Sequence, residues 1–294
     1  MWKRGRKMTK IPRVDFHMHS SVSDGTDSPE QLLDLVRQAG FEMFSVTDHD
    51  TLAGTAQIRA LLKEGDPQYI SGIEFSCKDE EGKYHILGYA YDYSAPAINE
   101  TVKLAHSYRD VKAHKRIEFV VNDLGIKLPQ EEVDGFLALE NPGKPHLANI
   151  LVKYGYAENK DQAIREILNK FKYPSQYVRP EQAIDGILRS GGIPVLAHPI
   201  FGSGDQLILG ADMEKRLEKL MAFGLQGVEG FYSEFSPEQR EFVLGLAEKH
   251  NLFVTAGSDY HGRNKTVKLG GNGLSEATSV PKGLSAFIER VSGS

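Results

Sequence analysis

Strand-like apolar runs alternate with amphipathic, helix-like runs at both ends of this 294-residue chain. The helix-like runs carry ordinary boundary signals: Ser28 and Pro29 are suited to begin a helix, and Gly40 is suited to end it. Alternation of this kind predicts an α/β fold with a parallel sheet or a barrel. The expected strands are residues 13–18, 42–47, 68–77, 84–91, 193–197, 227–232 and 252–256.

The middle of the chain has a different pattern, without strand-like runs. Residues 97–175 are almost entirely helix-like, with expected helices at residues 99–124, 145–153 and 160–170. We therefore predict a barrel built from residues 11–96 and 176–294, with a helical subdomain inserted between these two segments.

The composition excludes several classes of protein. Apolar residues make up 40% and charged residues 26% of the chain, which is typical of a soluble globular protein and not of a disordered or fibrous one. Thirty-five basic and 40 acidic residues give a net charge of −5. Because stable binding to duplex DNA depends on many phosphate contacts, we expect none here, although a small nucleotide or a short single strand is compatible with this charge.

The single cysteine, Cys77, cannot form an internal disulfide, so we expect a reducing, cytoplasmic location. No run approaches the roughly 18 apolar residues that a membrane span needs, so no membrane association is expected. The basic residues 1–10 have no apolar stretch behind them, and we expect no secretory signal.

Histidines gather at the ends of the expected strands. His17 and His19 lie two residues apart at the end of the first strand, so both imidazoles share a face and can reach one metal ion. Carboxylates lie at similar positions, at Glu74 and Asp259. In a barrel the carboxyl ends of the strands meet at one rim, and imidazoles with carboxylates but no thiolates favour zinc, manganese or iron. The other histidines at strand ends are His49, His85, His198 and His261.

Seven short motifs along residues 14–261 together resemble the polymerase-and-histidinol-phosphatase (PHP) family of metal-dependent phosphoesterases. The resemblance implies a distorted seven-stranded (β/α) barrel that holds two or three divalent metal ions (Mn, Fe or Zn) and no organic cofactor. The motifs are Asp15-Phe16-His17-Met18-His19, Ser23-Asp24-Gly25, Thr47-Asp48-His49-Asp50, Gly72-Ile73-Glu74-Phe75-Ser76, His85-Ile86-Leu87-Gly88-Tyr89, Ala197-His198-Pro199 and Gly257-Ser258-Asp259-Tyr260-His261.

The same resemblance implies which residues hold each metal ion, with Glu74 shared between two of them. Asp24 is a ligand only by the family pattern, because Ser23-Asp24-Gly25-Thr26 is also a good turn. The first set is His17, His19, Glu74 and Asp259. The second set is Asp24, His49 and His261, and the third is Glu74, His85 and His198.

A water molecule bound to such metal ions becomes a hydroxide near neutral pH, and this hydroxide attacks the phosphorus of a phosphate ester. The leaving alkoxide then needs a proton. Asp48 and His261 are the two candidate catalytic donors, and the sequence does not choose between them. Asp48 is also suited to orient a ligand histidine instead of donating a proton.

Within the family, the helical insertion resembles the cap of nucleotide phosphatases, which implies a substrate cap over residues 97–175. The resemblance implies as substrate a nucleoside 3′,5′-bisphosphate, a nucleoside monophosphate or the 5′ end of a short RNA. Relatives commonly have arginine where Lys144 stands, and lysine binds phosphate only as a point charge. The candidate substrate-binding residues are Lys144, Arg109, Arg116 and His146, and Tyr173, Tyr177 and Phe201 either stack a base or serve as packing.

Two alternatives remain at this stage. One is a histidinol-phosphate-type phosphatase that acts on a small amino alcohol, although the helical insertion argues against it. The other is a non-catalytic metal-binding module, which the complete set of expected ligands argues against. We expect a monomer or a small homo-oligomer.

Overall fold

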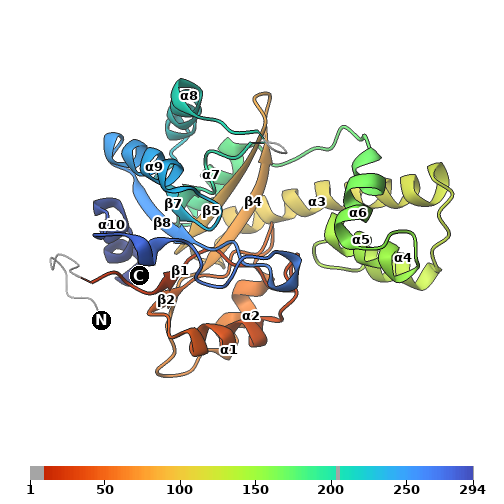
Figure 1. Ribbon diagram of the computed structural model, residues 1–294, viewed down its shortest axis with the longest axis horizontal. Helices are drawn as coiled ribbons and strands as arrows, with labels where there is room; N and C mark the ends of the chain where they lie inside the picture. Colours follow the sequence, from red (N-terminus) through yellow and green to blue (C-terminus); the bar gives the residue numbers. More distant parts are fainter. Residues whose placement is uncertain (1–9, 203–205, 294) are drawn as a thin grey trace.

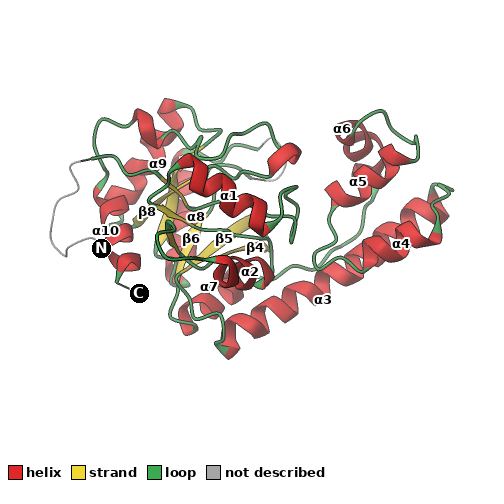
Figure 2. Cartoon of the chain, turned by 90° about the horizontal axis from the view of Figure 1, so that it is seen from below, coloured by secondary structure: helices red, strands yellow, loops and turns green. Residues whose placement is uncertain are grey.

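The computed structural model describes residues 10–202 and 206–293. The strand-bearing part and a group of helices lie side by side, and the long helix α3 (Pro96–Glu118) runs from one to the other (Figures 1 and 2). The basic residues 1–9, for which the sequence predicts no secretory signal, lie outside the described residues.

Eight strands in two sheets are present in the described part of the chain, so the α/β class is confirmed. A parallel sheet has the order β1-β2-β3, and a five-stranded sheet has the order β4-β5-β6-β7-β8. The strand expected at residues 68–77 is divided into β3 and β4. The strands are β1 (Val14–Asp15), β2 (Met43–Phe44), β3 (Gln68–Tyr69), β4 (Gly72–Lys78), β5 (Lys83–Tyr89), β6 (Ile193–Leu196), β7 (Gly227–Tyr232) and β8 (Phe253–Gly257).

Strand β5 runs antiparallel to both β4 and β6, as the polar turn Asp79-Glu80-Glu81-Gly82 between the two expected strands indicates, whereas the other neighbouring strands pair in parallel as the alternation predicts. The physical reason is the short turn between β4 and β5. Asp79 Oδ1 accepts hydrogen bonds from the amides of Glu81 and Gly82, and a turn this tight joins only antiparallel strands. The first residues of β5 therefore lie beside the carboxyl ends of β4 and β6.

The two sheets are linked on both sides. The amide of Phe16 donates to the carbonyl of Ala256 at 2.9 Å, which joins the chain after β1 to β8. On the other side, His49 and Glu74 form a parallel bridge between the segment after β2 and β4. These links bring the strand ends of both sheets to one place, while closure into a seven-stranded barrel stays a prediction.

Helices cover the strands on the outside. Helix α1 shows how the sequence sets their limits: Ser28 Oγ accepts from the amide of Gln31, Gln31 Oε1 accepts from the amide of Ser28, and Gly40 ends the helix at φ 64°. The other helices are α2 (Ala53–Leu61), α7 (Pro180–Arg189), α8 (Gly210–Ala222), α9 (Pro237–Lys249) and α10 (Lys282–Ser292), with α1 at Pro29–Ala39 and the short turns η4 (Gly262–Asn264) and η5 (Leu274–Glu276).

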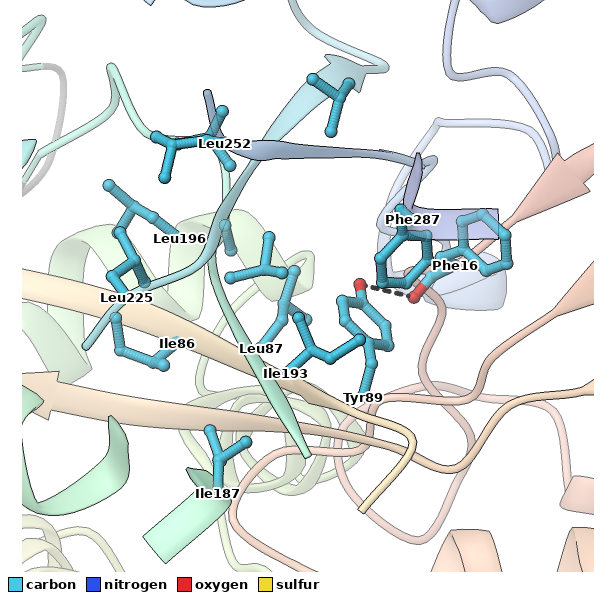
Figure 3. Packing of buried hydrophobic residues seen from close by; sticks show 14 of the residues in the cluster. Phe16, Ile86, Leu87, Tyr89, Ile187, Ile193, Leu196, Leu225, Leu252 and Phe287 are labelled. Carbon is cyan, nitrogen blue, oxygen red and sulfur yellow. Dashed lines mark hydrogen bonds between the residues drawn. The ribbon is translucent and has the colours of Figure 1, made fainter. Parts of the chain in front are cut away.

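The main core lies between the five-stranded sheet and α7, α8, α9 and α10, and Figure 3 shows part of it, while α1 and α2 pack in a separate cluster. The ring of Phe287 lies 5.2 Å from that of Phe16 and 5.3 Å from that of Tyr89, both edge to face. Tyr89 also donates a hydrogen bond to the carbonyl of Phe16 at 2.9 Å. Because Phe16 precedes His17, this packing fixes the start of the site described below.

The helical part has its own apolar cluster, which includes Val120, Phe136, Leu147 and Leu151. The predicted helix at 99–124 is present as α3 followed by the turn η1 (Phe119–Asp123). The first turns of α3 pack in the main core, so the domain limits at 97 and 175 stay a prediction. The remaining elements are α4 (Gln130–Leu137), α5 (Lys144–Lys153), α6 (Lys160–Gln162), η2 (Ala163–Ile167) and η3 (Leu168–Lys170).

Asp15 is a buried carboxylate that ties three segments together. It accepts hydrogen bonds from Ser258 N at 2.9 Å, Ser258 Oγ at 2.6 Å, Gly270 N at 2.7 Å and His17 N at 3.2 Å. Through these hydrogen bonds Asp15 holds the segments that carry His17 and Asp259 at a fixed separation. Burial raises the pKa of Asp15 to about 6.

We expect Asp15→Ala to lower the free energy of unfolding by about 2–4 kcal/mol, because it leaves several buried donors without an acceptor. Urea denaturation with a chelator present measures this without a contribution from metal binding. The matched control is Asp34→Ala, whose exposed carboxylate pairs with Arg37 and which should barely move the midpoint. Equal shifts in both variants would contradict the role of Asp15.

Candidate metal centre and its two cavities

The predicted ligands come together where the strands end. His17 and His19 follow β1, and Glu74 lies within β4. His198 lies two residues beyond β6, and Asp259 follows β8. His85 is the third residue of β5. Because β5 runs antiparallel to its neighbours, its first residues lie at the same rim as the carboxyl ends of those strands.

The tightest group contains His17, His19, Glu74 and Asp259, all buried. His17 Nε2 and His19 Nε2 are 3.1 Å apart, and they lie 3.2 and 3.0 Å from Glu74 Oε2. Both nitrogens lie 3.4 Å from Asp259 Oδ1. Ligands held at about 2.1 Å from one metal ion are separated by roughly 3.0–3.4 Å, so these four atoms are spaced as ligands of one ion.

A second group is more open and is formed by His19, Asp24, His49 and His261. Asp24 Oδ1 lies 3.2 Å from His261 Nε2, 3.9 Å from His19 Nδ1 and 4.0 Å from His49 Nε2. Relative to the sequence expectation, His19 joins this group in addition to the first. The group can hold an ion with room left for water or substrate.

A third group shares Glu74 with the first. Glu74 Oε1 lies 2.8 Å from His85 Nδ1 and 3.5 Å from His198 Nε2, and these two nitrogens are 3.2 Å apart. His49 Nδ1 lies 3.2 Å from Glu74 Oε2, so His49 presents one nitrogen to each of two groups. All the ligands expected from the sequence therefore lie in one continuous cluster.

Unpartnered buried atoms show that this cluster suits a cation. Both carboxylate oxygens of Glu74, Oδ1 of Asp24 and Nδ1 of His49 are buried without a hydrogen-bond partner among the described residues. Such atoms are costly unless something else satisfies them. Burial opposes ionisation of Glu74, but the imidazoles of His49 and His17 outweigh it and hold the pKa of Glu74 well below its usual value. An ionised carboxylate among imidazoles is the donor set that divalent transition metals bind.

Glu229 is a functional residue that the sequence reasoning missed. It is fully buried on β7, its Oε1 lies 2.9 Å from His17 Nδ1, and its Oε2 accepts from the amide of His198 at 2.8 Å. Glu229 thereby directs Nε2 of His17 toward the other ligands. The available signal was an acidic residue inside an apolar strand, since glutamate is rarely buried without a partner.

The chain passes so close to these residues that only glycine fits at one position. A Cβ added to Gly257 would lie 2.2 Å from the Cβ of His17 and 2.3 Å from Glu229 Oε1. The backbone is also strained nearby, with positive φ at Asp50 (54°), His198 (28°) and Asp259 (56°). Strain at these positions is retained because the surrounding packing holds the side chains where the site requires them.

The structure separates the two candidate proton donors. Asp48 accepts hydrogen bonds from Ser20 N at 2.8 Å, Ser20 Oγ at 2.7 Å and Ser23 Oγ at 2.7 Å, and it lines neither of the two cavities beside the cluster. In this position Asp48 is suited to orient the segment between His19 and Asp24. His261 does line a cavity, and its Nδ1 bonds to the carbonyl of Asp259.

Two cavities flank the metal-ligand cluster, and Asp24, His49 and His85 line both. The first, here called the basic cavity, has a volume of about 260 Å³. The second, here called the outer cavity, has a volume of about 600 Å³ and is walled in part by Phe201 and Leu207. The cations of the basic cavity are Lys83, Arg109, Lys112, Arg116 and Lys144.

Three of the four predicted substrate-binding residues line the basic cavity, and the fourth does not. Arg109 pairs with Asp50 and donates to Ser76 Oγ at 2.8 Å, and Lys144 donates to Asn169 Oδ1 at 2.6 Å. His146 instead lines a separate small cavity, and its Nδ1 accepts from the amide of Gly143. His146 is therefore not among the residues that line the basic cavity.

Two further cations there escaped the sequence reasoning. Lys112 lies three residues after Arg109 and four before Arg116, so all three share one face of α3. Lys83 lies two residues before His85 on β5, on the same face of the strand. These spacings were the available signal. Burial, together with the neighbouring cations, lowers the pKa of Lys112 to about 7.

Comparison with known proteins places the chain in a family. A family model described as the PHP domain matches residues 15–178, more than half of the chain. The chain belongs to the PHP domain family. It is a hydrolase, a metal-dependent phosphoesterase.

Three curated relatives match over most of their length. A 5′-3′ exoribonuclease of Haemophilus influenzae is 29% identical over 276 residues, covering 90% of this chain and 95% of the relative. A phosphoribosyl 1,2-cyclic phosphate 1,2-diphosphodiesterase of Eggerthella lenta is 31% identical, covering 85% and 94%. A 3′,5′-nucleoside bisphosphate phosphatase of Chromobacterium violaceum is 27% identical, covering 85% and 88%.

A solved structure has the same fold over nearly the whole chain. It comes from Bifidobacterium adolescentis, is provisionally named a metal-dependent phosphoesterase, and superposes with a TM-score of 0.80 at 28% identity. The superposition covers 96% of this chain and 98% of that one. Among the described helices, none is both long and apolar enough to cross a membrane.

We expect the protein purified without chelator to contain two or three transition-metal ions per chain. Glu74→Gln should lose at least one of them, because the Glu74 carboxylate serves two ligand groups. Elemental analysis of both proteins measures this. A matched control is Glu214→Gln: Glu214 lies in an unrelated group with Glu218 and His250, where Lys249 already pairs with it. Less than one ion per chain in the unaltered protein would contradict the assignment.

Proposed function

We propose that this protein hydrolyses a phosphate ester of a nucleotide, with the scissile phosphate at the metal-ligand cluster and a second phosphate in the basic cavity. The observation that carries the proposal is the basic cavity itself. It shares Asp24, His49 and His85 with the cluster, so a phosphate bound there lies next to the reacting one.

Two or three divalent ions of manganese, iron or zinc would supply a hydroxide nucleophile and neutralise the charge of the reacting phosphate. The three ligand groups described above would hold them: His17, His19, Glu74 and Asp259; Asp24, His49 and His261 with His19; and Glu74, His85 and His198 with His49. Glu229 keeps His17 oriented, and Asp48 keeps the turn between His19 and Asp24 in place.

The leaving alkoxide must be protonated as its bond to phosphorus breaks. Of the two candidates, His261 is the proposed donor, because it lines a cavity while both oxygens of Asp48 accept hydrogen bonds from Ser20. Because Nδ1 bonds to the carbonyl of Asp259, Nε2 is the one ring nitrogen of His261 that can hold a metal ion or a proton, so His261 donates the proton only while it is not a metal ligand. Its Nε2 lies 3.2 Å from Asp24 Oδ1, at the more open of the ligand groups.

The charge balance of the basic cavity favours a dianionic group. Asp50 pairs with Arg109, and the other four cations form no ion pair with a carboxylate of the described residues. Arg116 is buried, and its Nε has no hydrogen-bond partner among the described residues. A phosphate would supply the missing acceptors. Four of the five cations come from α3 and α5, which supports a role for residues 97–175 as a substrate cap.

The relatives support a nucleotide substrate, because one is named an exoribonuclease and another a nucleoside bisphosphate phosphatase. We propose a nucleoside 3′,5′-bisphosphate, a nucleoside monophosphate or the 5′ end of a short single strand. A histidinol-phosphate-type substrate fits less well, since its ammonium group would face the cations of the basic cavity. Cytoplasmic location, the oligomeric state and the absence of stable duplex binding stay predictions.

The substrate proposal predicts a preference for a nucleoside 3′,5′-bisphosphate over the matching 3′-monophosphate. Removing one charge-assisted phosphate contact with Lys144→Ala should lower the ratio of the two kcat/KM values roughly tenfold. Steady-state kinetics on both substrates measures the ratio. Lys127→Ala, an exposed lysine of the same helical part, is the matched control and should leave the ratio unchanged. An equal loss on both substrates would assign Lys144 a structural role.

The pKa of Lys112 predicts a pH dependence. Its ammonium is protonated below about pH 7 and attracts the second phosphate, so KM for the bisphosphate should rise as pH increases from 6.5 to 8. In Lys112→Met, KM for the bisphosphate should rise much less with pH. KM for the 3′-monophosphate should not rise with pH in either protein. A profile unchanged in the variant would contradict the prediction. The groups that face Lys112 are Lys83, Arg109, Arg116, Lys144 and Tyr177.

A further inference from the structure

The ligand groups of the metal centre are supported from different parts of the chain. In the first group, Glu229 on β7 contacts the ring of His17. Tyr232, on the same strand, donates to Asp259 Oδ2 at 3.0 Å. Ligands of the second group are also linked to the helical part by hydrogen bonds. The proposed hydrolysis uses the helical part only for its cations, and this role does not account for those hydrogen bonds.

Asn141 links the helical part to the metal ligand His49. It lies in the turn between α4 and α5, is buried, and donates from Nδ2 to the carbonyl of His49. Beside it, Glu140 Oε1 accepts from Thr51 Oγ1 at 3.1 Å. Because a buried hydrogen bond is costly to break, Asn141 resists movement of the His49 backbone. The position of His49 therefore depends on the turn between α4 and α5.

Lys160, on α6, is linked to two other ligands of the second group through Asn264. Its Nζ donates to the carbonyl of Asn264 at 2.8 Å and to Oδ1 of the same residue at 3.1 Å. Asn264 donates from Nδ2 to the carbonyl of Asp24 at 2.7 Å and from its backbone amide to the carbonyl of His261 at 3.2 Å. Since the ammonium engages Oδ1, the amide group of Asn264 is oriented with Nδ2 toward Asp24.

The geometry of the second ligand group makes its affinity for an ion sensitive to such contacts. Asp24 Oδ1 lies 3.9 Å from His19 Nδ1 and 4.0 Å from His49 Nε2, wider than the roughly 3.0–3.4 Å expected between ligands of one ion. Asp24 lies beyond the end of β1, so strand pairing does not set its distance from His49. Residues that orient metal ligands from outside typically change metal affinity by about ten- to a hundredfold.

We propose that Asn141 and Lys160 are positioning residues of the second ligand group, so that the affinity of this group for its ion depends on contact with the helical part. The inference rests on the metal assignment within the proposed function, and not on the choice of substrate. Because coupling between two sites is reciprocal, ion binding by this group also stabilises the position of the helical part and of the cations that it adds to the basic cavity.

Binding of Mn²⁺ to chelator-treated protein tests the proposal without any substrate. Free Mn²⁺, measured by its electron paramagnetic resonance signal during a titration, gives the number and the affinities of the bound ions. We expect Lys160→Met to weaken the binding of one ion roughly tenfold and to leave the others within about twofold. The direction of the change is decisive, because removing a positive charge would by itself strengthen cation binding.

Lys153→Met is the matched control. It removes the same charge from α5, where Lys153 pairs with Glu132 inside the helical part, and it should weaken the binding of no ion. Lys160→Arg keeps a donor and should retain the affinity of the unaltered protein.

Two further variants test the route of the effect. Asn141→Ala should weaken the same single ion as Lys160→Met does, because both residues support one ligand group. If Lys160 acts through Asn264, the double variant Lys160→Met/Asn264→Ala should bind Mn²⁺ no more weakly than Asn264→Ala alone.

Three results would count against the proposal in different ways. Unchanged or tighter binding in Lys160→Met or in Asn141→Ala would overturn the role of the residue replaced. Equal weakening of every ion would overturn the assignment to the second group, because it would indicate a general loss of structure. An unaltered protein that bound no Mn²⁺ would instead contradict the metal assignment, and with it the proposed function.

Discussion

The carboxylate of Glu74 is the constraint on which the rest of the site depends. It is buried, has no hydrogen-bond partner among the described residues, and lies within 2.8–3.5 Å of a ring nitrogen from each of five histidines. An ionised group in this position needs cations around it. Asp15 and Glu229 hold two of these histidines in place: Asp15 accepts from the amide of His17, and Glu229 contacts the ring of His17 and accepts from the amide of His198.

The fold places several cations on one side of the Glu74 cluster and an apolar wall on the other side. The strands bring the ligands together, and α3 and α5 add most of the cations on one side of them. On the other side lies the segment after β6, whose Phe201 and Leu207 add an apolar wall.

Much of this site could be predicted from residues read along the chain. The expected strands, the helical character of residues 97–175 and the ligands from His17 to His261 all depend on local patterns, and the structure places those ligands in one cluster. The polar turn at residues 79–82 indicated that β4 and β5 are joined as a hairpin, whereas the alternation of strands and helices gave no sign that β5 is also antiparallel to β6. His146 was a candidate because it is a basic residue of the helical insertion, but it lines a different cavity from Lys144, which lies two residues earlier on α5.

The sequence by itself determined which chemistry the chain carries: imidazoles and carboxylates at strand ends, a helical middle part and a near-neutral balance of charge. These properties belong to single side chains and short periodic patterns, so they do not depend on how the chain folds. Only the tertiary structure decided that His49 serves two ligand groups, that Glu229 supports His17, and that the cluster separates a basic cavity from an apolar-walled one. Those facts depend on distances between residues far apart in sequence, which are set by how the two sheets and α3 pack together.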